Sequence, residues 1–258
     1  MANESKFRTM KNSNKEEGLL VPYLNQEITR LGDNVWPEEY AIKLYNKERV
    51  WDGYFHPSVH AAAAELALYY EFHPDWNIRA PQSNVDKIMT FQVGSAYHSL
   101  LQSMFIHMGL TTEEEVEVGF TNEERWVSGH IDIRKIWLPN GEVLPVEIKS
   151  TGYLPKEPSE NYIKQFQIYM DVGCEEPQEK GIMLYLAKTY PHKFREFIVY
   201  RDEKILNEVY NKFDRVWEAI GTDNPDMLEF PCHEIDSREH QWCIANRVCK
   251  LGPPSISS

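Results

Sequence analysis

The sequence predicts an α/β protein, and three observations support this prediction. Residues 129–149, GHIDIRKIWLPNGEVLPVEIK, hold two alternating apolar runs around a Pro-Asn-Gly turn, which is typical of a β-hairpin. Residues 181–187, GIMLYLA, form a continuous apolar run typical of a buried central strand, and the alternating run REFIVY follows it. Segments with helical periodicity precede and follow these strands. Strands and helices are therefore expected to share one core.

Length and composition favour one catalytic domain with additions at both ends. The chain has 258 residues, 42% of them hydrophobic, and no apolar run approaches the ~20 residues that span a bilayer. The beginning of the chain has no signal-peptide core, so a soluble, cytoplasmic protein without membrane contact is expected. We divide the chain into a disordered arm (1–18), a helical N-terminal region (19–90), a core (91–222) and a Cys- and His-containing tail (223–258).

Helices are expected at three places before the hairpin. Residues 37–47 begin with a proline suited to a first turn, and residues 56–74 read as one long helix with Ser58 as N-cap and four alanines. Residues 91–109 form the third, in which Gly94 and His98 are four apart and share a face. His98 is either a metal ligand or a half-buried histidine bonded to the backbone.

The hairpin carries the candidate catalytic residues. A strand at 116–120 is expected beside it, on which Glu117 is either a group that supports the site from behind or, the preferred interpretation, a solvated strand residue. Asp132 lies among apolar residues of the first hairpin strand, and Glu147 and Lys149 leave the second strand on the same face. Two carboxylates suit Mg²⁺ or Mn²⁺, and a lysine beside them suits hydrolysis of a phosphodiester. The alternative is a solvated edge hairpin in which Lys149 only pairs with Glu147.

The segments after the hairpin add candidate substrate contacts. Ser150 follows Lys149 directly and is placed to bind a phosphate. Gln165 and Tyr169 share one face of a helix that ends near residue 173, which is also readable as an ordinary amphipathic helix. The turn at 188–193 offers basic side chains for phosphates or plain surface charge, and residues 202–221 form a packing helix.

Taken in order, GHIDI, EIK and QFQIY resemble the RecB-like branch of the PD-(D/E)XK nuclease superfamily, which includes phage-type and CRISPR-associated exonucleases. This resemblance implies a restriction-endonuclease-like core with a mixed central sheet flanked by helices. It also implies that His98, Asp132 and Glu147 bind Mg²⁺ or Mn²⁺, that Lys149 activates water, and that Gln165 and Tyr169 lie against the site and the DNA. Family members commonly carry a cluster cysteine where this chain has the alanines 61–64.

The tail, residues 223–258, contains three cysteines, whose thiolates are soft metal ligands. Cys232, Cys243 and Cys249, with His240 nearby, suit Zn²⁺ or an iron–sulfur cluster, and the spacing of the last two cysteines resembles the family's cluster-binding tail. A Cys3His site and a remnant without metal both remain open.

The function expected is a metal-dependent DNA exonuclease acting on free ends, in phage or prokaryotic replication, recombination or repair, with a protein partner from that process. The formal net charge of −13 opposes this expectation, because proteins that bind phosphates usually show a basic surface. A catalytically dormant nuclease-fold module for DNA binding or assembly, and a hydrolase of small nucleotides, are the alternatives.

Overall fold

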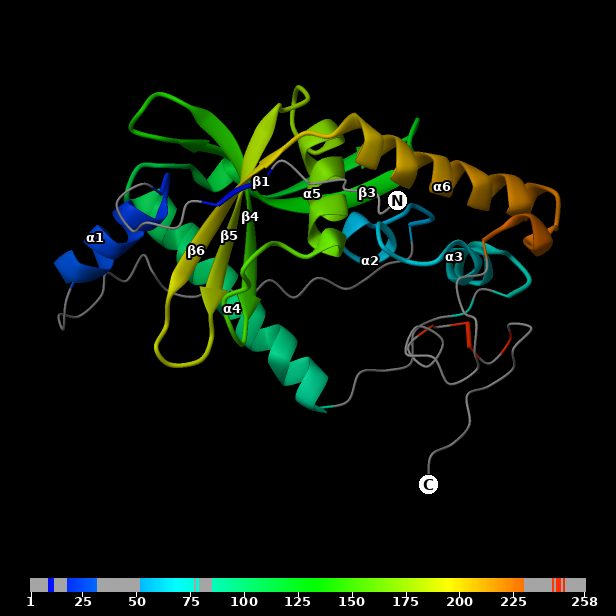
Figure 1. Cartoon of the computed structure of the whole chain (residues 1–258), viewed down its shortest axis with the longest axis horizontal. Coiled ribbons are helices and arrows are strands. Elements are labelled where there is room, and N and C mark those ends of the chain that lie inside the picture. The colour runs from blue at the N-terminus through cyan, green and yellow to red at the C-terminus, as the bar shows by residue number, and fades with distance from the viewer. Residues whose placement is uncertain are drawn as a thin grey trace, which may run out of the picture.

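A computed structural model describes residues 9–11, 18–31, 52–76, 78, 85–229, 243, 245–246 and 248. Its centre is a six-stranded sheet with the order β1-β6-β5-β4-β3-β2 (Figure 1). Only β4 and β5 pair in parallel among these strands, and the other neighbours are antiparallel. The predicted α/β class with a mixed sheet flanked by helices is confirmed. The strands are β1 (Thr9–Lys11), β2 (Val116–Asn122), β3 (Val127–Trp137), β4 (Val143–Thr151), β5 (Lys180–Ala187) and β6 (Phe194–Tyr200).

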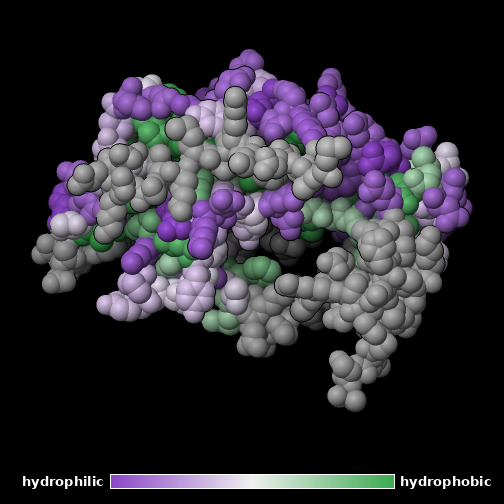
Figure 2. Space-filling model, viewed as in Figure 1, coloured by the Kyte–Doolittle hydropathy of each residue, from purple (hydrophilic) through white to green (hydrophobic). Residues whose placement is uncertain are grey.

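Helices cover both faces of the sheet. Residues of α1 (Val21–Leu31) and α4 (Val85–His107) share a core with one face, while α5 (Glu160–Val172) packs on the other face. A separate cluster joins α3 (Glu65–Phe72) to α6 (Glu203–Gly221) around Phe55. Figure 2 shows that α6 turns a mainly hydrophilic surface outward, as its amphipathic sequence requires.

The caps of α5 and α6 explain why these helices begin and end where the sequence indicates. The Ser159 hydroxyl accepts from the backbone N–H of Tyr162, and Gly173 closes the other end of α5. The Asp202 carboxylate accepts from the first-turn N–H groups of α6. Such caps satisfy donors that have no partner inside the helix.

The long helix predicted for residues 56–74 is wrong. The chain forms two helices, α2 (Pro57–His60) and α3, with residues 61–64 between them, and Ser58 is not an N-cap. The Lys212 ammonium from α6 donates to the carbonyls of His60 (3.0 Å), Ala61 (2.7 Å) and Ala63 (3.0 Å). These distant contacts hold the carbonyls out of a continuous helix despite the helix propensity of the alanines.

The N-terminal expectations have mixed outcomes. Thr9–Lys11 pair with residues 197–199 of β6 as β1, so the predicted disordered arm is wrong for these three residues. The expected helix at 37–47 lies outside the described residues. The helix predicted at 91–109 begins six residues earlier, at Val85. No helix in the described part of the chain is long and apolar enough to cross a membrane.

A buried carboxylate attaches α1 to the sheet. Glu196 of β6 is 1% exposed and accepts from the backbone N–H groups of Leu20 (2.7 Å) and Val21 (3.0 Å), and also from that of Leu19. Negative charge at a helix N-terminus is favourable because the free N–H groups point toward it. One side chain of β6 thus fixes where α1 starts.

Candidate active site

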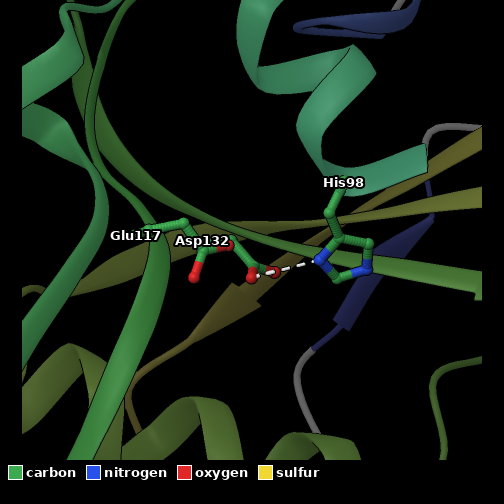
Figure 3. A group of neighbouring side chains, drawn as sticks. All are labelled: His98, Glu117 and Asp132. Atoms are coloured by element: carbon green, nitrogen blue, oxygen red, sulfur yellow. Dashed lines mark hydrogen bonds and ion pairs between the residues drawn. The ribbon is translucent and has the colours of Figure 1, made fainter. Parts of the chain in front are cut away.

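Three elements carry the predicted catalytic and metal-binding residues. Asp132 is on β3, Glu147 and Lys149 are on β4, and His98 is on α4. The antiparallel register pairs Val116 with Ile133 and Val118 with Ile131, which places Glu117 of β2 opposite Asp132. Figure 3 shows the Glu117, Asp132 and His98 side chains converging from three elements.

His98 and Asp132 form a partly buried pair. The His98 Nδ1 lies 3.2 Å from the Asp132 Oδ1, and the Asp132 Oδ2 accepts from the backbone N–H of Ile148 at 2.6 Å (Figure 3). Burial lowers the pKa of His98, but the Asp132 carboxylate outweighs burial and raises it above its usual value. Burial raises the pKa of Asp132, and His98, Lys149 and the Ile148 N–H outweigh it, so this carboxyl stays ionised.

A second network links Lys149 to α5. The Lys149 Nζ donates to Glu147 Oε1 (2.6 Å) and Gln165 Oε1 (2.9 Å), while the Gln165 Nε2 donates to Glu147 Oε1 (2.9 Å) and the Tyr169 hydroxyl (3.0 Å). The structure therefore groups the predicted residues of the hairpin with those of the helix. Gln165 and Tyr169 are 4% and 3% exposed; Gln165 holds Lys149 and Glu147, and Tyr169 accepts from Gln165. Their predicted contact with the substrate stays a prediction.

Neighbouring charges and burial shift the pKa values of both Glu147 and Lys149. Burial and the neighbouring Asp132 carboxylate raise the pKa of Glu147 to about 7, although Lys149 acts in the opposite direction. Burial lowers the pKa of Lys149, but Glu147 and Asp132 outweigh it and the pKa rises. At neutral pH Lys149 is thus a cation and Glu147 lies near its titration midpoint.

Sequence reasoning missed Glu117, which was predicted to be a solvated strand residue. Its backbone is left-handed (φ 51°), a conformation that non-glycine residues rarely adopt. Gln102 donates through Nε2 to Glu117 Oε1 (2.9 Å) and to the Asp132 carbonyl (3.0 Å). The acidic residue in the strand beside the hairpin was the available signal, but its opposition to Asp132 depends on the strand register.

The donor atoms present fit a hard divalent cation. One nitrogen of His98 and one carboxylate oxygen each from Glu117 and Asp132 lie within 4.8 Å of one another. The Glu147 Oε2 is buried and has no hydrogen-bond partner, while Oε1 is held by Lys149 and Gln165. Carboxylate oxygens with one imidazole suit Mg²⁺ or Mn²⁺. Glu117 therefore joins the predicted ligands His98 and Asp132, whereas the predicted ligand Glu147 is not one of these three donors and is distinguished by its unpartnered oxygen.

The remaining predicted site residues are Ser150 and the cysteines and histidine of the tail. Ser150 is half-buried near the end of β4. A Cβ at Gly94 would lie 3.2 Å from the Ser150 Oγ, so this glycine permits a close approach of α4 to β4. In the tail, Cys232, His240 and Cys249 lie outside the described residues. Cys243 is described and is half-buried. The predicted zinc or iron–sulfur site therefore stays a prediction.

Comparison with known proteins does not identify this chain. No protein-family model matches it, and no curated protein matches it. One solved structure, described as "Crystal structure of SSO0001", is similar at 17% identity with a TM-score of 0.47, covering 91% of this chain and 98% of that chain.

Proposed function

We propose that the protein is a metal-dependent DNA exonuclease of the RecB-like type, which hydrolyses phosphodiester bonds. The observation that carries the proposal is the group of His98, Glu117 and Asp132 donors, which suits a hard cation and is bonded through Asp132 to β4, the strand that carries the Lys149–Glu147 pair. A solvated edge hairpin would not bury this group: Glu147 is 2% exposed, and Lys149 contacts both Glu147 and Gln165.

Each side chain has a role that follows from its contacts. Lys149 remains charged, so it donates hydrogen bonds to the attacking water or to a phosphate oxygen and does not take the proton itself. Glu147 accepts hydrogen bonds from Lys149 and Gln165 through Oε1, which leaves its Oε2 for a cation. Gln165 holds these two side chains in place through its two hydrogen bonds to them.

The cation would be held by His98, Glu117 and Asp132, with the unpartnered Oε2 of Glu147 as a further donor. A bound Mg²⁺ or Mn²⁺ supplies charge stabilisation at the phosphate and lowers the pKa of a water. The hydrogen bond from the Ile148 N–H to Asp132 keeps that carboxylate oriented toward the group.

The test uses linear single-stranded, linear double-stranded and closed circular DNA with Mg²⁺, Mn²⁺ or EDTA. Loss of linear DNA only, abolished by EDTA and in both Asp132→Ala and Lys149→Met, is the expected result. Lys149→Met is chosen because methionine retains most of the side-chain volume. Circular dichroism is the control that both variants are folded. No cleavage of any substrate by folded wild-type protein supplied with Mn²⁺ would refute the proposal.

A catalytically dormant DNA-binding or assembly module is the second candidate, and the net charge of −13 favours it. The two candidates differ in whether divalent-dependent cleavage exists and disappears in Lys149→Met. For the enzyme we propose a cytoplasmic setting in a prokaryotic or phage-infected cell, with a protein partner in DNA replication or recombination.

A further inference from the structure

Two adjacent loops form a surface at the edge of the sheet to which β4 carries Lys149. Thr151 and Ala187 are the last paired residues of the parallel strands β4 and β5, so the loops that follow leave the sheet at the same edge. The Lys188 N–H donates to the Thr151 carbonyl (2.8 Å), and the Thr189 hydroxyl donates to the Gly152 carbonyl. Residues 150–156 and 187–195 therefore form one surface, which we call the edge surface.

Tyrosine rings stand in solvent on the edge surface. Tyr153 is 85% exposed and Tyr190 is 91% exposed, one in each loop. A third ring, that of Tyr162, is 37% exposed, and the Lys149 Nζ lies 4.4 Å from its centroid. Exposed aromatic rings offer flat apolar faces that can stack with other planar groups. Tyr162 belongs to α5, outside the two loops, and its ring contacts Lys149 of the candidate active site.

The edge surface is basic although the whole chain is acidic. Residues 150–156 and 187–195 contain Lys156, Lys188, Lys193 and Arg195, and neither segment contains Asp or Glu, whereas the chain has a net charge of −13. Arg195 donates to the Pro155 carbonyl at 2.5 Å, and Lys156 and Lys193 are exposed. Local positive charge next to exposed rings matches a ligand that carries both phosphates and planar bases.

We propose that the edge surface binds one unpaired strand of DNA and leads it to Lys149. Tyr153 and Tyr190 stack on bases, and Lys156 and Lys193 contact phosphates. Base faces are accessible only outside a duplex, so this mode selects unpaired DNA. Stacking also lets an acidic protein hold DNA with few phosphate contacts. The inference rests on the proposed function for its substrate and adds how that substrate is held.

The test measures binding by fluorescence anisotropy, with the full-length protein in EDTA so that no cleavage occurs. The probes are a labelled oligothymidylate and a labelled blunt duplex. Tyr153→Ala and Tyr190→Ala are each expected to weaken oligothymidylate binding about fivefold or more, because one base–aromatic stack contributes about 1 kcal/mol at least. Tyr153→Phe and Tyr190→Phe keep the ring and should bind within about twofold of wild type.

Trp76→Ala is the matched control, because Trp76 is a 48% exposed aromatic residue that follows α3, outside the edge surface. Its affinity should equal that of wild type. Wild-type affinity in both Ala variants, equal losses in the Phe and Ala variants, or equal losses for the duplex would overturn the inference.

Cleavage by the wild-type protein, measured in parallel with Mn²⁺ on bis(p-nitrophenyl) phosphate and linear DNA, separates the two proposals. If the wild-type protein cleaves and the Tyr→Ala variants keep wild-type affinity, the edge-surface proposal fails and the nuclease proposal stands. Absence of cleavage with weakened binding in the Ala variants rejects the nuclease and supports the edge surface.

Discussion

Glu117→Gln should raise the stability of the metal-free protein and weaken its response to Mn²⁺. In the metal-free state a Glu117 oxygen lies within 4.8 Å of an Asp132 oxygen, so two carboxylates repel each other. Coulomb's law at 4.8 Å gives about 0.9 kcal/mol at a dielectric constant of 80 and about 3.5 kcal/mol at 20. Glu117 is half-buried, which favours the lower end of this range. The glutamine carbonyl can still accept the hydrogen bond from Gln102.

The assay is urea unfolding followed by circular dichroism, in EDTA and in saturating Mn²⁺. In EDTA we expect the variant's free energy of unfolding to be about 1 kcal/mol higher than that of wild type. Wild type should gain about 2.7 kcal/mol when Mn²⁺ is at one hundred times its Kd, and the variant should gain less by about 1.4 kcal/mol for each tenfold rise in Kd. A variant that is more stable than wild type in EDTA but gains less stability from Mn²⁺ identifies Glu117 as a metal ligand.

Glu124→Gln is the control, because Glu124 is exposed in the turn between β2 and β3 and its substitution changes the net charge equally. Its stability should match wild type in both conditions. A destabilised Glu117→Gln with an unchanged Mn²⁺ response would refute the reasoning and make Glu117 a structural strand residue.

Three further outcomes are expected. Mn²⁺ affinity, measured by calorimetry, should rise as the pH rises through the raised pKa of His98, because the imidazole must lose its proton to bind metal. In EDTA, the stability that the His98–Asp132 pair contributes is present below pH 6.5 and is lost as the pH rises through the same pKa. A pH-independent Mn²⁺ affinity would exclude His98 as a ligand. Lys212→Met should lower the free energy of unfolding by about 1–3 kcal/mol, because carbonyls at the end of α2 lose the donor that α6 supplies. Lys204→Met, at an exposed position of α6, should leave the free energy of unfolding unchanged. Glu196→Gln should cost about 1–3 kcal/mol in the same assay, because the amide offers one acceptor oxygen where the carboxylate offers two to the N–H groups of Leu19, Leu20 and Val21. Wild-type stability would contradict this.

Elements whose signals are local could be predicted from the residues alone. The Pro-Asn-Gly turn and flanking alternation predicted β3 and β4, and the apolar run at 181–187 predicted the central strand β5. Ser159 and Gly173 mark the two ends of α5 as capping residues. A strand period of two also placed Glu147 and Lys149 on one face. Most of the candidate site was predictable because its motifs lie on these elements.

Features that depend on contacts between distant segments could not be predicted from local patterns. The register of β2 against β3 brought Glu117 to Asp132, and no local pattern specifies that register. Lys212 interrupts the alanine-rich helix from about 150 residues away, and Glu196 fixes α1 from a similar separation. Gln165 turned inward because a buried Lys149 and Glu147 require partners. Satisfying buried charges and backbone groups in three dimensions outweighed local propensity at each of these places.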